Sequence, residues 1–477
     1  MSMNFSVMAI FPEITLIALA VLALILDFVL KNKRAIAWLI ILSLSCVLLY
    51  LCRVPALNMS LFSGMLVLDS FTLFCKIISV FIAIMVMLIS LDYPQIPENY
   101  RIEFYSLLLM STSAMMFLGG TNNLLMIYLG IEFLGLISYI IAAYWRGNLK
   151  SSESGLKYFL IGTASSITML YGISLLYGIT GSLDLGEINA LLSNGSANPA
   201  ALSIIILTIL IGLAFKIAMA PVHFWCPDVY EGAPTPVTAF FSVGPKLAGF
   251  AVLLRFLYVG SPYFYQHWSH LLGILALVTM IIGNVTALVQ TNIKRMLAFS
   301  SIAHAGYALI GLVIGKESGQ VSLFVYLSSY VIMNLGAFAA VIAISNKTKS
   351  DEIKDYAGLS QNSPYLAAML TVFLLSLAGM PPLVGFIGKF YIFSAAIKEG
   401  FIFLVIAAVL NSVIAAYYYF IIIKTMYLDK PQKQIEIRTS LALNLALILL
   451  LIFTLACGLY PQPLINLSSC ALNINLP

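Results

Sequence analysis

Five titratable residues lie inside long apolar runs of this sequence, where charged side chains are rare. Glu132, Lys216, Lys246 and Lys389 stand well within such runs, and His304 is a further titratable residue in another run. A charge at the centre of a bilayer costs roughly 2.5–3.5 kcal/mol on insertion scales, so these side chains should face a bundle interior, a partner or water. Residues of this kind are candidates for an ion or proton path.

The types of these residues favour protons as the transported species. A lysine in a low-dielectric site holds its proton less tightly, and a nearby carboxylate restores the affinity. Making and breaking a Glu132–Lys216 ion pair could therefore load or expel a proton. Lys216, Lys246 and Lys389 in series would repel one another when all are charged, so that protonation of one favours release from the next.

His304 could bridge gaps between these sites, because imidazole changes charge near neutral pH. It could equally be a hydrogen-bonded packing residue. A static ion-pair network also remains open as a role for the whole set. Four other basic residues lie nearer the ends of apolar runs, where snorkelling to the interface is the simpler interpretation. These residues are Lys76, Lys157, Arg255 and Lys424.

The elements that must position these residues are membrane-spanning helices. Of the 477 residues, 61% are hydrophobic and 9% charged, against roughly 25% charged in soluble domains. Runs long enough to span a bilayer follow one another almost end to end, and we expect an all-α polytopic protein whose N-terminus is the first span rather than a cleaved signal peptide. Fourteen runs are expected, at about 9–30, 35–52, 66–90, 103–118, 124–144, 154–178, 201–220, 235–259, 269–289, 296–314, 321–344, 365–393, 400–427 and 440–459.

Several other chemistries find no support in the sequence. The six cysteines show no CxxC or CxxxC spacing, and there is no glycine-rich phosphate loop or dinucleotide fingerprint. The net charge of +5 forms no basic stripe interleaved with aromatic residues, so nucleic acid is not an expected partner. We expect no metal and no bound cofactor in this chain.

The basic residues of the connecting loops are divided between two sides, which supports the count of fourteen. The odd-numbered loops contain Lys31, Lys33, Arg34, Arg101, Arg146, Lys150, Lys294, Arg295, Lys347, Lys349, Lys354, Lys430, Lys433 and Arg438. The even-numbered loops contain only Arg53, Lys316 and Lys398. The positive-inside rule then places the odd loops in the cytoplasm and both termini on the periplasmic side.

Two of the expected spans are interrupted. Pro221 breaks the seventh, and Gly379, Pro381 and Pro382 break the twelfth. The two breaks lie five spans apart, so the broken helices would be inverted in the membrane. Paired broken helices in inverted halves indicate an ion or substrate site in transporters, although an ordinary proline kink is the alternative for either helix alone.

Three long motifs carry a resemblance to a known family. They are PVHFWCPDVYEGAPTPVTAFFSVGPKLAGFA at 221–251, NIKRMLAFSSIAHAGY at 292–307 and GMPPLVGFIGKFYIF at 379–393. The sequence resembles the antiporter-like membrane subunits of NADH:quinone oxidoreductase (respiratory complex I), and within that family the subunit N group of bacteria. The middle-sized group typically has a glutamate where Lys389 stands here, and the largest has a long C-terminal extension that is not expected in this chain.

The resemblance implies which residues carry protons. The family's fifth-span glutamate falls on Glu132, and its lysines of the seventh, eighth and twelfth spans fall on Lys216, Lys246 and Lys389. Its helper lysine corresponds to Lys157, and His304 lies in the tenth-span histidine motif. The implied role is proton translocation coupled to quinone reduction that takes place in other subunits.

The resemblance also implies an architecture and a setting. Two inverted five-helix repeats, residues 103–260 and 261–428, would be flanked by residues 1–102 and 429–477. NADH, FMN, iron–sulfur clusters and quinone would be bound by other subunits of the complex. The partners would be other membrane subunits, including the middle antiporter-like subunit and small hydrophobic subunits, in the bacterial inner membrane.

Three alternatives remain open from the sequence. A subunit of a related multi-subunit cation/proton antiporter would share the lysines and the broken helices. A silent scaffold would use the ion pairs only to hold a membrane arm together. A chloroplast-type dehydrogenase that uses ferredoxin would look similar in the membrane arm.

Overall fold

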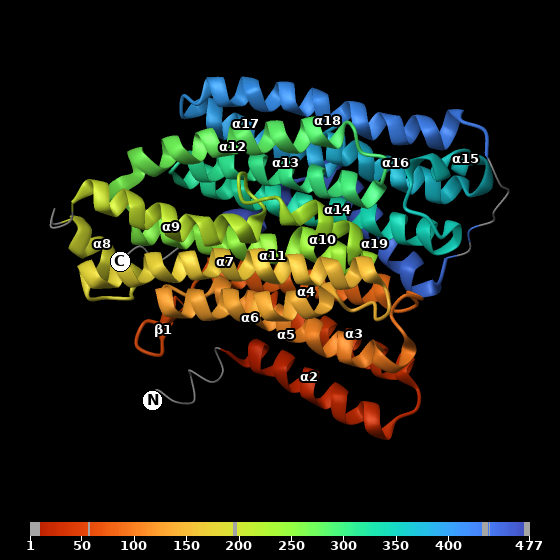
Figure 1. Cartoon of the computed structure of the whole chain (residues 1–477), viewed down its shortest axis with the longest axis horizontal. Helices are drawn as coiled ribbons and strands as arrows, with labels where there is room; N and C mark the ends of the chain where they lie inside the picture. Colours follow the sequence, from red (N-terminus) through yellow and green to blue (C-terminus); the bar gives the residue numbers. More distant parts are fainter. Residues whose placement is uncertain (1–9, 56–57, 194–197, 432–436, 438, 472–477) are drawn as a thin grey trace.

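The protein is a bundle of long helices that run side by side along the horizontal direction of Figure 1. A computed structural model describes residues 10–55, 58–193, 198–431, 437 and 439–471. Lys433 and Arg438, two basic residues expected in the odd-numbered loops, lie outside these ranges, as do both termini.

Thirteen helices of the described ranges are long and apolar enough to cross a membrane. They are α2 (Phe11–Val29), α3 (Lys33–Leu51), α4 (Ser70–Ser90), α5 (Arg101–Gly119), α6 (Leu124–Ala142), α7 (Leu149–Thr180), α9 (Pro199–Ile217), α11 (Thr235–Arg255), α12 (Tyr265–Ala287), α13 (Ile293–Val313), α14 (Glu317–Thr348), α18 (Ile402–Leu428) and α19 (Leu441–Leu459). The expected twelfth span is divided into two shorter helices, α16 (Pro364–Ala378) and α17 (Val384–Lys398). Each of the fourteen predicted runs therefore contains one long helix or, in the twelfth, two shorter ones, and the predicted all-α fold is confirmed.

Short elements occupy the connections between the long helices. They are β1 (Met59–Leu61), β2 (Leu66–Leu68), α8 (Leu185–Ser193), α10 (Trp225–Gly232), α15 (Leu359–Asn362), α20 (Gln462–Cys470) and the single turns η1 (Glu98–Tyr100), η2 (Phe256–Gly260), η3 (Pro262–Phe264) and η4 (Ile353–Tyr356). The two strands form an antiparallel hairpin in which Ser60 pairs with Val67. The hairpin and α8 follow even-numbered spans and lie at one end of the bundle, whereas α15 follows an odd-numbered span and lies at the other end (Figure 1).

Asparagine caps fix where the helices that carry candidate residues begin. The Asn123 side chain accepts hydrogen bonds from the backbone N–H groups of Leu125 and Met126 at the start of α6. Asn292 does the same for Lys294 and Arg295 at the start of α13. Such caps satisfy N–H groups that have no partner within the helix.

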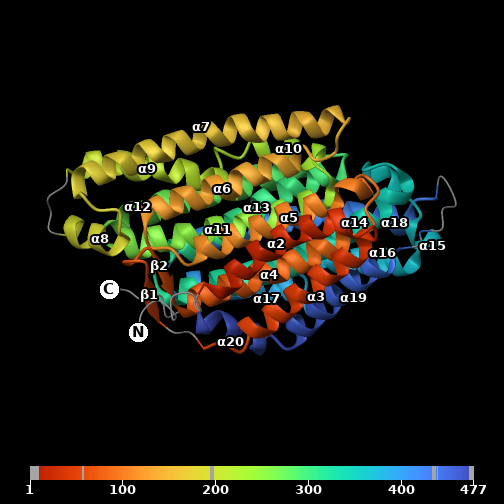
Figure 2. The same cartoon turned by 90° about the horizontal axis from the view of Figure 1, so that it is seen from below.

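Three helices, α11, α13 and α14, are buried along their whole apolar length. A helix that is apolar on all sides belongs in the centre of a bundle, and Figure 2 shows these three inside the surrounding helices. The outer helices instead expose large apolar side chains such as Phe28, Leu149 and Leu428. This pattern is the one expected where lipid surrounds the protein.

Candidate functional site

Lys216 lies at the point where the first broken helix stops. Helix α9 ends at Ile217, and the next residue, Ala218, adopts a left-handed conformation with φ of 58°. The Lys216 side chain is 1% exposed. A Cβ on Gly249 of α11 would stand 2.6 Å from Ile217 Cγ2 and 3.4 Å from Lys216 Cβ, so that glycine lets α11 approach the base of the lysine.

Glu132 and Lys216 are near each other but do not form a contact ion pair in the described structure. Glu132 lies on α6, is half-buried and accepts a hydrogen bond from the Ser166 hydroxyl of α7. It is close enough to Lys216 for the two charges to interact electrostatically. Among the described residues the Lys216 ammonium has no hydrogen-bond partner. The predicted switch pair is therefore seen in a separated arrangement.

Lys246 lies in the middle of α11 and is 2% exposed. Its ammonium donates to the backbone carbonyl of Ser301 on α13 at 2.6 Å and also to the Ser301 hydroxyl. These two acceptors satisfy a charge that is otherwise surrounded by apolar helices.

His304 lies one turn farther along α13, where it is 2% exposed. Its Nδ1 is 2.6 Å from the hydroxyl of Tyr326 on α14, and its Nε2 is 3.5 Å from the hydroxyl of Tyr419 on α18. Both ring nitrogens therefore face tyrosyl hydroxyls. A histidine held in this way can accept a proton on one nitrogen and release one from the other.

Lys389 lies at the second helix break. Its ammonium donates to the carbonyl of Ala378, the last residue of α16, at 2.8 Å and to the hydroxyl of Ser412 on α18 at 2.6 Å. It also stands 5.0 Å from the centre of the Tyr307 ring, an arrangement that favours a cation. The carbonyl end of a helix carries partial negative charge, so the break supplies the lysine with a partner.

The buried helix α13 connects these residues. Ser300, Ser301, His304 and Tyr307 follow one another at helical spacing, and all four are buried. Lys246 meets this row at Ser301, and Lys389 meets it at Tyr307. The structure thus joins three of the predicted residues, Lys246, His304 and Lys389, along one helix. Lys216 adjoins them through the contact between α9 and α11.

Lys157 lies apart from the buried row, in a group of charges at the end of the bundle beside α10. The group, which we call the α10 ionic cluster, consists of Lys150, Lys157, Asp228, Glu231 and Arg295. Asp228 contacts Lys157 at 2.6 Å and Arg295 at 2.7 Å. Burial would raise the pKa of Asp228, but hydrogen bonds from these two cations outweigh it and hold that pKa below its ordinary value. A hollow of about 190 Å³ lies within the cluster.

Snorkelling is the wrong interpretation for two of the four residues to which the sequence assigns it. Lys76 forms a buried ion pair with Glu13 at 2.8 Å, and Arg255 forms one with Asp69 at 2.8 Å. Arg255 also donates to the Gly119 carbonyl. Lys424, by contrast, is exposed.

The acidic partners Glu13 and Asp69 are absent from the sequence-based set of candidates. Each stands at the start of an apolar run, where a carboxylate is usually solvated. The sequence offered one signal for each ion pair: a basic residue in one span and an acidic residue near the same end of another span.

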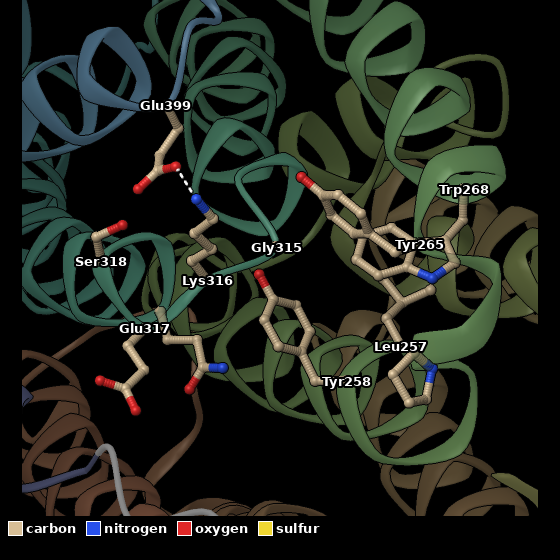
Figure 3. A pocket seen from close by; sticks show the side chains of 11 residues that line it. Leu257, Tyr258, Tyr265, Trp268, Gly315, Lys316, Glu317, Ser318 and Glu399 are labelled. Carbon is tan, nitrogen blue, oxygen red and sulfur yellow. Dashed lines mark hydrogen bonds and ion pairs between the residues drawn. The ribbon is translucent and has the colours of Figure 1, made fainter.

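A second hollow, of about 620 Å³, lies at the other end of α13 (Figure 3). The Tyr258 hydroxyl donates to the Leu312 carbonyl, and the Tyr265 hydroxyl donates to the carbonyls of the next two residues, so both tyrosines cap the end of this helix. On the opposite side Lys316 pairs with Glu399 at 2.5 Å. The hydrogen bond to Glu399, together with its charge, raises the pKa of Lys316.

Comparison with known proteins assigns the family. Residues 121–415 match the family model described as NADH:quinone oxidoreductase/Mrp antiporter, TM. NADH-quinone oxidoreductase subunit N of Trichlorobacter lovleyi is 42% identical over 470 residues, which are 98% of this chain and 96% of that protein. The chain belongs to the subunit N family of NADH-quinone oxidoreductase. The resemblance expected from the three motifs is confirmed.

The subunit N family assignment agrees with a solved structure. A chain of respiratory complex I from Thermus thermophilus is 31% identical, with a TM-score of 0.81 over 96% of this chain and 99% of that one. The chloroplastic NAD(P)H-quinone oxidoreductase subunit 2 of Mesostigma viride is 38% identical over 476 residues, 96% of this chain and 95% of that protein. Members of the subunit N family are multi-pass membrane subunits of an enzyme complex.

Proposed function

We propose that this chain is a proton-translocating membrane subunit of an NADH:quinone oxidoreductase. It performs no redox step, and quinone reduction in other subunits drives it. The observation that carries the proposal is the buried row on α13, where Lys246 and Lys389 are each held between a backbone carbonyl and a serine hydroxyl on either side of His304. Membership in the subunit N family supports the proposal that other subunits of the same complex carry out the electron transfer.

The separated Glu132–Lys216 arrangement gives the first step of the mechanism. Approach of the carboxylate stabilises the charged form of Lys216, and its withdrawal leaves an ammonium with no described partner in a buried site. The proton then moves toward Lys246, and the repulsion among successive charged lysines favours onward release through His304 to Lys389. Lys157 and the α10 ionic cluster lie at the end of the bundle where protons would be collected.

The setting that we propose follows from the family and the loop charges. Other subunits would bind NADH, FMN, iron–sulfur clusters and quinone. This chain would contact the middle antiporter-like subunit and small hydrophobic subunits in a bacterial inner membrane. Both termini would lie on the periplasmic side, because the odd-numbered loops are basic. The 38% identity to a chloroplastic relative keeps a chloroplast-type complex as the second candidate.

We also propose that residues 103–260 and 261–428 are two inverted repeats. Corresponding helices break in the same manner, which supports the proposal. Helix α9 ends before Ala218 with φ of 58°, and α16 ends before Gly379 with φ of 91°. In both, the N–H of the following residue bonds back to a carbonyl of the last turn. Each break lies beside one of the buried lysines.

Glu132→Gln tests the proposed switch, because it keeps the side-chain shape and removes the charge. NADH:quinone activity and proton pumping are measured in membranes, with assembly checked on a native gel. We expect both activities to fall severalfold in an assembled complex. The matched control is Glu187→Gln, which changes an exposed carboxylate on α8 and should have no effect. Full pumping in assembled Glu132→Gln complex would support the scaffold alternative instead.

A further inference from the structure

Tyr419 reaches from α18 into the buried row of α13, where its hydroxyl lies near Ser300 and His304. Its hydroxyl lies 2.5 Å from the Ser300 hydroxyl, and either oxygen can be the donor. The same tyrosyl hydroxyl lies 3.5 Å from Nε2 of His304. Ser300 and Tyr419 are both completely buried.

We propose that Ser300 and Tyr419 form a hydroxyl bridge that carries the proton between Lys246 and His304. This inference rests on the proposed function and names the residues that carry the proton over one of its steps. The bridge begins one residue from Ser301, whose oxygens receive the Lys246 hydrogen bonds. Side chains of consecutive helical residues point about 100° apart, so the step from the Ser301 hydroxyl to the Ser300 hydroxyl is the part of the path that the proposal adds to the observed contacts.

Hydroxyl groups suit this step because each can donate one hydrogen bond while it accepts another. In the transfer, Tyr419 gives its proton to Nε2 of His304 as it takes one from Ser300. Ser300 is in turn reprotonated by the Ser301 hydroxyl, which takes a proton from the Lys246 ammonium, and Lys246 becomes a neutral amine. His304 becomes an imidazolium until Nδ1 releases a proton toward Tyr326, 2.6 Å away. Each hydroxyl gains one proton and loses one.

Tyr330 offers a competing route around the bridge. Its ring lies 4.9 Å from the His304 ring, and its buried hydroxyl makes no hydrogen bond with the described residues. Tyr419 is the better assignment because its oxygen already bonds to both neighbours in the row. A relay through Tyr330 would need its hydroxyl to form two bonds that it does not make here.

The test removes single hydroxyl groups and leaves the rings in place. Tyr419→Phe and Tyr330→Phe are compared with Tyr258→Phe, a control that also removes a tyrosyl hydrogen bond to α13 but lies outside the row. Ser300→Ala removes the other half of the bridge. Lys246→Ala reports on the proposed function itself. The readouts are protons pumped per NADH, turnover, and the solvent deuterium isotope effect on turnover, all in assembled complex.

The bridge predicts that Tyr419→Phe and Ser300→Ala lower pumping and turnover severalfold and raise the isotope effect, while the Tyr258 and Tyr330 variants behave as the wild type. Wild-type behaviour of Tyr419→Phe beside a defective Lys246→Ala would overturn the bridge and leave the proposed function intact. Equal losses in the Tyr419 and Tyr258 variants, or a loss in Tyr330→Phe alone, would also overturn it. If Lys246→Ala pumps normally, the proposed function fails with it.

Discussion

Of the three lysines proposed to carry protons, two are satisfied in the same way and the third is not. Lys246 and Lys389 each donate to one backbone carbonyl and one serine hydroxyl. Lys216 has no such acceptors among the described residues, although its side chain is 1% exposed. A buried charge without hydrogen bonds is costly, so its protonation state should respond most strongly to Glu132. This difference makes Lys216 the controlling residue of the series.

The buried Arg255–Asp69 pair has a different role, because it lies outside the row and Arg255 bonds to several fixed partners. Arg255→Met would leave the Asp69 carboxylate buried without its cation and should cost about 3–5 kcal/mol. We expect less of the subunit in membranes and a lower thermal stability of the complex. Replacing both residues, in Arg255→Met with Asp69→Asn, should recover part of the loss, because asparagine removes the charge and can still accept the hydrogen bond from the Thr72 N–H at the start of α4. Unchanged stability in the single variant would contradict a structural role for the pair.

At the residue scale the sequence predicts buried charges well and their partners poorly. Glu132, Lys216, Lys246 and Lys389 can be chosen because long apolar runs flank them on both sides. Arg255 is also buried, but its position near the end of a run cannot be distinguished from a snorkelling site without knowing that Asp69 lies opposite. Hydrophobicity is a local property of the chain, whereas an ion pair joins residues 186 positions apart.

At the scale of elements, close approach between helices sets the position of the lysines. Gly249 is the residue of α11 that faces the end of α9, and an added Cβ would stand 2.6 Å from Ile217. Overpacking of this kind costs about 1–3 kcal/mol and moves the neighbouring backbone. The break in α9 and the position of Lys216 therefore depend on a residue without a side chain.

Gly249→Ala should for this reason lower pumping while the complex still assembles. The matched control is Gly178→Ala in α7, where an added Cβ would meet no atom within 4 Å. Both variants are measured by proton pumping and by native gel. Equal activity of the two would show that the spacing between α9 and α11 does not govern Lys216.

The helix breaks could be predicted from prolines, but their consequences could not. Pro221 and Pro382 indicate where α9 and α16 stop, yet the acceptor that the second break offers to Lys389 is the carbonyl of Ala378, which no sequence pattern marks. The sequence also could not predict that α13 carries the buried row, because its serines and tyrosine look like ordinary small and aromatic residues. Their function follows only from the helices that pack around them.

At the scale of the whole molecule, α13 runs between two polar ends. It begins beside the α10 ionic cluster, where Arg295 contacts Asp228, and it ends where Tyr258 and Tyr265 cap its carbonyls. Between these ends it carries the buried row that Lys246 and Lys389 join. One helix therefore connects the two ends of the bundle, and the proposed proton path follows it from Lys246 onward.

The most direct test is proton pumping by purified complex carrying Lys216→Ala, reconstituted in vesicles and compared with Lys424→Ala, which changes an exposed lysine. Removing the controlling lysine should abolish most NADH-driven pumping and lower quinone reduction in a complex that still assembles, while the control remains normal. Pumping at the wild-type rate and the wild-type number of protons per NADH in the Lys216 variant would contradict the proposed path.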